Sequence, residues 1–298
     1  MTSGWNWRFL RKPRWLIGTV VLLAAAFVMI NLGLWQLRRL HQRLERNSAI
    51  EARMNAPAVP LARALARFDF TVPLGAADSA AYRHVEATGR YVPADEVLLR
   101  SRSLGGHPGF HVLTPLELPG GRALLVDRGW VPYTDNDPPL PDAAPPAGEV
   151  NVSGLLREPD PLPRGEFTWL SPSDPVSGPL RKTFYANPQR LQPQMPFPLV
   201  GGYLQLVTQS PAQPGELPVA PGAPDLSNGP HLSYAIQWFS FSAIALVGYG
   251  AVFVRRARDP ESDADADREA EERRRREAAA GAGDDPRGDG GGAVPSGD

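Results

Sequence analysis

Two long apolar runs dominate the pattern of hydrophobic and polar positions along the chain. Residues 15–35 (WLIGTVVLLAAAFVMINLGLW) and 232–254 contain no charged side chain. A helix rises about 1.5 Å per residue and the hydrocarbon layer of a bilayer is about 30 Å thick, so each run is long enough to cross a membrane. The first run is longer than the core of a signal peptide, and no small-residue cleavage site follows it. The pattern therefore predicts two uncleaved transmembrane helices, at 15–35 and 231–254.

Charges around these runs predict the orientation of the chain in the membrane. Arginines flank the first run on both sides, so that run alone is ambiguous. The second run is followed by Arg255, Arg256 and Arg258, whereas residues 204–232 contain no Lys or Arg. By the positive-inside rule, both termini are expected in the cytoplasm. The predicted organisation is a multi-pass protein of the cell membrane with a cytoplasmic N-terminus (1–14), a first transmembrane helix (15–35), an extracytoplasmic domain (36–230), a second transmembrane helix (231–254) and a disordered, charged cytoplasmic tail (255–298).

Alternating apolar and polar positions between the two runs predict a sheet. The expected strands cover residues 83–91, 96–103, 110–118, 122–131, 149–157 and 203–209, with Gly and Pro turns between them. Short helices are expected near 61–67 and within 183–191, and residues 36–56 keep helical spacing as a polar stalk that extends the first helix. Short antiparallel strands of this kind favour one β-rich domain. The predicted fold class is therefore a membrane protein of α+β type, with two transmembrane helices flanking a β-rich extracytoplasmic domain.

Composition narrows the chemistry that the chain can perform. The 298 residues include 33 prolines and no cysteine, and the formal net charge is −1. The lack of cysteine excludes disulfides, thiolate zinc sites and iron–sulfur clusters held by this chain alone. The charge balance gives no indication of nucleic-acid binding. No P-loop, HExxH, GxSxG or Gly-rich Rossmann turn is present, so the sequence predicts that the protein is not an enzyme.

Two local motifs in the predicted sheet carry polar side chains of interest. His107 and His111 form HPGFH, but on a strand they would lie about 13 Å apart, so only a sharp turn would make them a metal pair. Asp127, Arg128 and Trp130 stand in DRGW, which we interpret as structural, with an Arg–carboxylate fork and a buried indole at a turn. His84 is expected to be a strand surface residue.

One stripe of the second helix carries an ionisable ring and aromatic side chains. Positions three, four and seven apart share a helix face, and the face contains His231, Tyr234, Ala235, Trp238, Ser242 and Ala245. The small residues suit close approach of another helix. Tyr234 fits an interfacial aromatic belt, but Trp238 lies roughly 10 Å below His231, two turns inside the run, which favours packing against a partner or a flat ligand. His231 is either a wetted cap residue or a ligand.

Four patterns together resemble the Surfeit locus protein 1 family, the cytochrome c oxidase assembly factors. They are NLGLWQLRRL (31–40), YRHVEATGRY (82–91), LLVDRGWVP (124–132) and HLSYAIQWF (231–239), and the resemblance covers about residues 15–255. Asp127 departs from it, because the family more often has Asn before Arg-Gly-Trp. The charged tail lies outside the resemblance.

The resemblance implies a role in building the haem-bearing large subunit of a terminal oxidase, with binding and delivery of haem a as one form of that role. His231 matches the family's helix-leading histidine and would ligate the iron, with Tyr234 and Trp238 beside the macrocycle. The implied partners are cytochrome c oxidase subunits, proteins of haem a synthesis and the lipid bilayer. The alternative is a scaffold that clasps oxidase subunits and binds no cofactor.

The predicted topology places the end of the first helix and the start of the second at the same membrane surface. Arg38 and Arg39 could then pair with the haem propionates, and Trp35 could cover an edge of the ring. The simpler interpretation is that both arginines anchor the helix among lipid headgroups.

Overall fold

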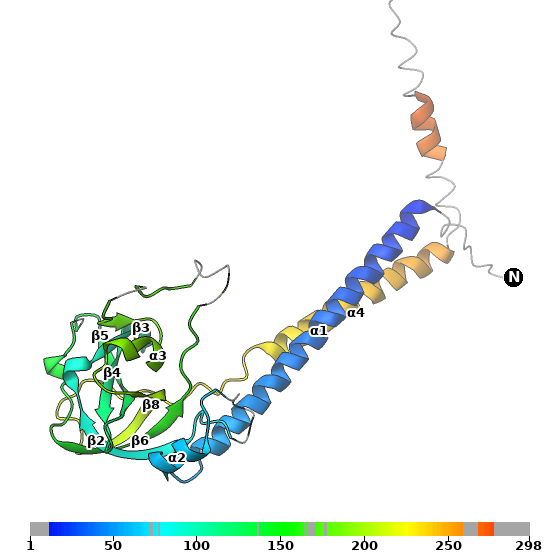
Figure 1. Ribbon diagram of the computed structural model, residues 1–298. Coiled ribbons are helices and arrows are strands. Elements are labelled where there is room, and N and C mark those ends of the chain that lie inside the picture. The colour runs from blue at the N-terminus through cyan, green and yellow to red at the C-terminus, as the bar shows by residue number, and fades with distance from the viewer. Residues whose placement is uncertain are drawn as a thin grey trace, which may run out of the picture. The chain divides into compact units, whose positions relative to one another are not determined.

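The computed structural model describes residues 12–71, 74, 76, 78–135, 137–163, 165, 171–175, 178–258 and 268–276 (Figure 1). The chain forms two units. The helix-pair unit comprises Met1–Leu40 and Gly229–Asp298, and the sheet unit comprises His41–Asn228. Of the predicted tail, residues 255–258 continue a helix and residues 268–276 are helical. The remaining tail residues, like residues 1–11, lie outside the described residues.

The helix-pair unit is built from α1 (Pro13–Met54) and α4 (His231–Arg258), of which α1 continues beyond Leu40 into the sheet unit as the expected stalk. Both helices are long and apolar enough to span a membrane. Their large apolar side chains mostly face outward, as at Ile17, Val21, Phe27, Ile236, Ile244 and Val247. Exposed apolar side chains on long helices are typical of segments that lie in lipid.

The two helices of this unit lie side by side and antiparallel (Figure 1). At one end the Thr19 hydroxyl contacts the Tyr249 hydroxyl, and at the other end Gln36 contacts His231. Near the His231 end, Phe239 packs against Gly33, where a side-chain carbon would come within 2.7 Å of the ring. These contacts fix the register in which the two helices pack.

The sheet unit contains a mixed sheet of eight strands within the described residues. The strands are β1 (Val59–Pro60), β2 (His84–Tyr91), β3 (Val97–Leu104), β4 (His107–Glu117), β5 (Ala123–Pro132), β6 (Glu149–Arg157), β7 (Lys182–Thr183) and β8 (Leu199–Ser210). Their order is β1-β2-β6-β8-β5-β4-β3-β7, and β2 also pairs with β4. The pairings therefore close β2, β6, β8, β5 and β4 into a barrel, which removes edges from these five strands.

Buried apolar side chains from all five barrel strands form one core cluster. It includes Val85, Leu116, Leu124, Val152 and Leu204, all at most 1% exposed. The helix α2 (Leu61–Arg67) adds Leu61 and Ala64 to this cluster. A second cluster includes Leu191 of α3 (Pro188–Leu191). The part of the chain that the structure describes also contains short 3-10 helices, namely η2 (Pro93–Asp95), η3 (Pro141–Ala143) and η5 (Gln192–Gln194).

The six expected strands and the helix at 61–67 are confirmed, with ends that shift by up to four residues. The short helix expected within 183–191 is confirmed as α3, where Pro188 begins the helix and Asn187 caps it by accepting a hydrogen bond from the Arg190 amide. The expectation of antiparallel strands is confirmed only in part, because the sheet is mixed. The pairs β5–β8, β1–β2 and β3–β7 are parallel, and each is connected by a long excursion of the chain, as parallel neighbours require.

The DRGW segment was expected at a turn, and this was wrong. It lies inside β5, where the pairing with β4 shifts register between His111 and Leu113. Gly129 has φ +123 at this bulge and lies against the Val219 carbonyl. Only glycine adopts this backbone conformation without strain, so it marks a β-bulge rather than a chain reversal.

Candidate functional site

His231 is the first residue of α4. Gly229, which precedes it, has φ +65, and Pro230 directly before the helix fixes the entry of the chain. The Tyr234 amide donates to the Pro230 carbonyl at 3.1 Å, which closes the first turn. His231 is half-buried at this helix start. Its ring is therefore held at the end of α4 rather than inside the apolar run.

Gln36 of α1 contacts the His231 ring. The His231 Nδ1 and the Gln36 Oε1 lie 2.8 Å apart. A side-chain carbonyl oxygen only accepts hydrogen bonds, so His231 Nδ1 is the donor in this pair. The neutral ring then carries its lone pair on Nε2, the nitrogen that is available to a metal. Sequence reasoning missed Gln36, because nothing in its local pattern separates it from other polar residues at the end of an apolar run.

Small residues of the predicted α4 stripe face α1. Ala235 and Ser242 are buried, and on α1 Ala26 and Gly33 are buried as well. Small side chains on both helices allow close approach of the backbones, as the sequence suggested. Because the helices approach closely, polar residues at the end of the contact can reach across it.

The aromatic residues of the predicted site are not fully buried in the contact between α1 and α4. Tyr234 is 47% exposed and Trp35 is 45% exposed. Trp238 is half-buried, and its ring meets Phe241 edge-on at 6.3 Å between ring centroids. Two exposed aromatic faces therefore remain on the helix-pair unit, in the turns that carry Gln36 and His231.

The two candidate arginines occupy different sides of α1. Arg38 is two residues beyond Gln36, which is about 200° around a helix, so its side chain leaves from the side away from the Gln36–His231 contact. Arg39 is three residues beyond Gln36 and stays on the nearer side. Its guanidinium lies 5.6 Å from the centroid of the Trp35 ring, over its face. Both arginines are exposed, and their pairing with a carboxylate stays a prediction.

These donors fit a haem. A neutral imidazole with Nδ1 bonded and Nε2 free is the form in which histidine ligates iron, and exposed aromatic faces suit a flat macrocycle. Arg39, already beside an aromatic face, is the cation placed to meet a carboxylate. The residues of the site come from α1 and α4 only, so the helix pair alone could hold the group.

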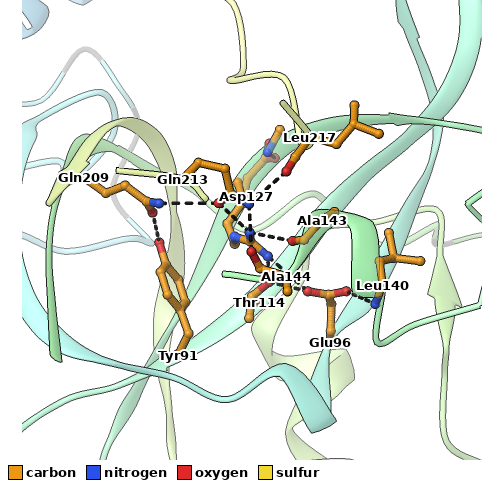
Figure 2. Close-up of polar contacts among 12 residues, drawn as sticks. Tyr91, Glu96, Thr114, Asp127, Leu140, Ala143, Ala144, Gln209, Gln213 and Leu217 are labelled. Carbon is orange, nitrogen blue, oxygen red and sulfur yellow. Dashed lines mark hydrogen bonds and ion pairs between the residues drawn. The ribbon is translucent and has the colours of Figure 1, made fainter. Parts of the chain in front are cut away.

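The sheet unit contains a second polar cluster, in which Arg128 contacts Glu96, Ala143 and Gln213, three residues that Figure 2 labels. The Arg128 Nη1 lies 3.3 Å from Glu96 Oε2, and both side chains are 1% exposed. The Arg128 Nη2 donates to the Ala143 carbonyl at 2.7 Å and to Gln213 Oε1 at 2.8 Å, and Thr114 donates to Glu96 at 2.8 Å. Tyr91 joins the cluster through Gln209, whose Oε1 accepts from the Tyr91 hydroxyl at 2.9 Å. This arrangement ties two loops to the barrel.

Burial governs the protonation of this cluster. It raises the pKa of Glu96, although Arg128 and the Thr114 hydroxyl both oppose the shift. Burial also lowers the pKa of Arg128, against the attraction of Glu96. The interpretation of Arg128 as a structural residue with a carboxylate partner is supported, but the partner is Glu96 and not its neighbour Asp127.

Asp127 faces the opposite side of β5. Its Oδ2 lies 2.9 Å from the Nδ1 of His111, so His111 is engaged by a carboxylate. His107 is exposed four residues away on the same strand, without the sharp turn that a metal pair would need. Among the described residues, no group of three or more His, Cys, Asp or Glu side chains could hold a metal ion. His84 meets Ser153 through Nε2 at 2.9 Å on the barrel surface.

Trp130 is half-buried rather than fully buried. Its indole packs against Gly109 of β4, where the ring nitrogen would lie 2.5 Å from an added side-chain carbon. Its main chain exchanges hydrogen bonds with Val219 at 2.8 and 2.9 Å. The segment therefore attaches the approach to α4 to the barrel, which the sequence did not indicate.

A groove of about 980 Å³ lies on the sheet unit, beside α2. Leu61 and Leu65 of α2 form an apolar wall, and Thr88, Asn151 and Thr208 of β2, β6 and β8 are polar. The sequence gave no indication of it, because its walls come from distant segments. A groove of this size has the volume of a typical ligand or peptide site.

Comparisons with known proteins agree on one family. A family model described as the SURF1 family matches residues 23–243. An uncharacterized SURF1-like protein of Mycobacterium tuberculosis strain H37Rv is 35% identical over 246 residues, covering 81% of this chain and 84% of that protein. A SURF1-like protein of Monosiga brevicollis is 28% identical over 255 residues, covering 79% and 86% respectively. A SURF1-like protein of Rickettsia felis is 29% identical over 113 residues, covering 37% and 45%.

Proposed function

Because this chain belongs to the SURF1 family, known generally as oxidase assembly factors, we propose that it is a membrane-anchored assembly factor for a haem–copper terminal oxidase. In this proposal the protein holds haem a at His231 and hands it to the large subunit of cytochrome c oxidase. The observation that carries the haem step is the His231–Gln36 contact of 2.8 Å, which leaves Nε2 as the ligand nitrogen.

The proposed setting is the cell membrane. Both α1 and α4 cross it, the termini lie in the cytoplasm, and the sheet unit lies outside. Two observations support this arrangement, namely the outward-facing apolar side chains of both helices and the three arginines in the last turn of α4. His231 then stands at the outer membrane surface, within reach of a haem that is partly embedded in lipid.

Each residue of the proposed site has a separate task. His231 binds iron, and Gln36 holds the ring. Trp35 and Tyr234 offer aromatic faces, and Arg39 meets a carboxylate at the edge. The bound haem supplies the redox centre that the oxidase needs, and this chain only binds, orients and releases it. The protein is a carrier in this proposal, not an enzyme.

The groove beside α2 favours a second candidate function, in which the chain is a scaffold without a cofactor. A groove of about 980 Å³ with one apolar and one polar wall suits an amphipathic segment of an oxidase subunit. This activity would not need His231. The two candidates therefore make opposite predictions for a histidine variant.

The deciding experiment purifies the full-length protein from cells that make haem a and records its absorption spectrum. His231→Ala should remove the Soret band and lower oxidase activity in membranes. His41→Ala, at an exposed histidine paired with Glu45 on α1, is the matched control and should change neither. Wild-type protein that supports oxidase assembly but carries no haem would favour the scaffold, and normal oxidase in cells without this protein would refute both candidates.

A further inference from the structure

We propose that Gln36 is a positioning residue for His231, which fixes the ring in its Nδ1–H form and directs Nε2 outward as the ligand. The inference rests on the proposed function, because it concerns how the same site holds haem. Gln36 itself does not touch the iron. It acts through the 2.8 Å hydrogen bond that its Oε1 accepts from His231 Nδ1.

A hydrogen bond to the second ring nitrogen is what a metal-binding histidine needs. It selects the tautomer, holds the plane of the ring and raises the basicity of the ligating nitrogen. Carboxylates and carbonyls are the usual acceptors, and the Gln36 side chain supplies a carbonyl. His231 therefore has an outer partner that belongs to a different helix.

The packing of the helix pair holds Gln36 in place. Gly33 lies one turn before it on the same face of α1, and the Phe239 ring lies against Gly33 where a larger residue would collide. At the far end, Thr19 and Tyr249 fix the same register. Because the register is set at both places, Gln36 meets His231 rather than a neighbouring residue of α4.

The pair could be only a polar tie between two helices. Polar side chains in apolar surroundings do associate across helices, and Thr19 with Tyr249 is such a case in this unit. A tie and a positioning residue differ in what the bound iron reports. If Gln36 is only a tie between the helices, its loss weakens haem binding and nothing else. If Gln36 is the acceptor that positions His231, its loss also makes the ligating imidazole less basic.

The test titrates the full-length protein in detergent micelles with ferric protoporphyrin IX. Gln36→Leu removes the acceptor and should weaken binding by roughly 10–100-fold, the usual effect of losing such a partner. The reduction potential of the bound iron should move to more positive values, since the imidazole becomes less basic. Gln36→Glu keeps an acceptor, so it should retain binding and move the potential to more negative values. Gln237→Leu, at an exposed glutamine of α4, is the matched control and should change neither quantity.

The outcomes separate this inference from the proposed function. Wild-type affinity in His231→Ala would refute haem binding at His231 and the inference with it. Loss of binding in His231→Ala together with wild-type affinity and potential in both Gln36 variants would refute the inference alone. Weaker binding in both Gln36 variants at an unchanged potential would show a helix tie and also overturn it. Circular dichroism of each variant confirms that the helices are intact.

Discussion

Removing the charge of Arg128 should destabilise the sheet unit severely. The change Arg128→Met keeps a long apolar stem but leaves Glu96 buried without its cation, and both side chains are 1% exposed in the native protein. Breaking a buried ion pair on one side costs about 3–5 kcal/mol, because an uncompensated charge remains. Since domains are stable by only about 5–15 kcal/mol, this change removes a large part of the free energy of unfolding.

The double variant Arg128→Met with Glu96→Leu should be more stable than Arg128→Met. It removes both charges, and an apolar pair of similar volume often replaces a buried ion pair without net loss. It still leaves the Ala143 carbonyl and the Gln213 side chain without the hydrogen bonds that Arg128 donates at 2.7 and 2.8 Å. It also leaves the Thr114 hydroxyl and the Leu140 amide without the Glu96 carboxylate that accepts from them at 2.8 and 3.2 Å. Each such loss costs about 1–3 kcal/mol. The double variant should therefore lie between the single variant and the wild type.

Pulse proteolysis of the full-length protein in detergent, across a urea series, measures these differences as shifts of the unfolding midpoint. Arg90→Met, at an exposed arginine of β2, is the matched control and should stay within about 0.5 kcal/mol of the wild type. A wild-type midpoint for Arg128→Met would refute the role of the ion pair. A double variant no more stable than the single one would show that the lost hydrogen bonds, not the stranded charge, dominate.

Three further predictions concern pH, helix packing and the tail. Burial raises the pKa of Glu96, so the Glu96 carboxyl keeps its proton to higher pH in the folded state than in the unfolded state. The free energy of unfolding should therefore fall as pH rises above the usual glutamate range. Urea titrations at several pH values measure this dependence, and Glu96→Gln should make it weaker. The Gly33→Leu side chain should collide with Phe239, and it should therefore lower the yield of a disulfide engineered across the α1–α4 contact. The chain has no cysteine of its own, so the engineered pair is the one disulfide that can form within it. Gly18→Leu is the control and should leave the yield unchanged, because Gly18 has no neighbour within 4 Å. Deleting residues 259–298, which carry few large apolar side chains, should leave protein abundance in immunoblots unchanged, and a truncated protein that fails to accumulate would contradict this.

The local pattern of apolar and polar residues was sufficient to predict the strands, but it did not predict which strands pair with one another. The six long strands each carry period-two alternation or an apolar run, which is readable from the sequence. The two-residue strands β1 and β7 have no period to read. The parallel pairing of β5 with β8 is decided by which strands can share one core cluster across a long excursion of the chain, and no local signal encodes that choice.

For the candidate site too, the sequence predicted one residue from its local pattern but not the residue that contacts it. The position of His231 at the start of an apolar run singled it out, and the small residues below it indicated a facing helix. The identity of the facing polar residue depends on helix register, which Gly33 and Phe239 decide by fit. Sequence reasoning placed Arg38 and Arg39 near His231 as partners of the haem propionates, but it did not identify Gln36 as the residue that contacts the ring.

Neighbouring residues of the DRGW motif attach different segments to one strand. Side chains alternate across a strand, so Asp127 holds His111 of β4 while Arg128 reaches Ala143 and the loop that carries Gln213. Gly129 lets the main chain approach Val219, which the Trp130 backbone then binds.

The DRGW motif therefore joins several segments of the sheet unit, and a variant there should act through stability. The motif at the start of α4 contains the candidate ligand, so a variant of its histidine should act through binding while the fold persists. Measuring abundance and haem content in the same preparations separates these two kinds of defect.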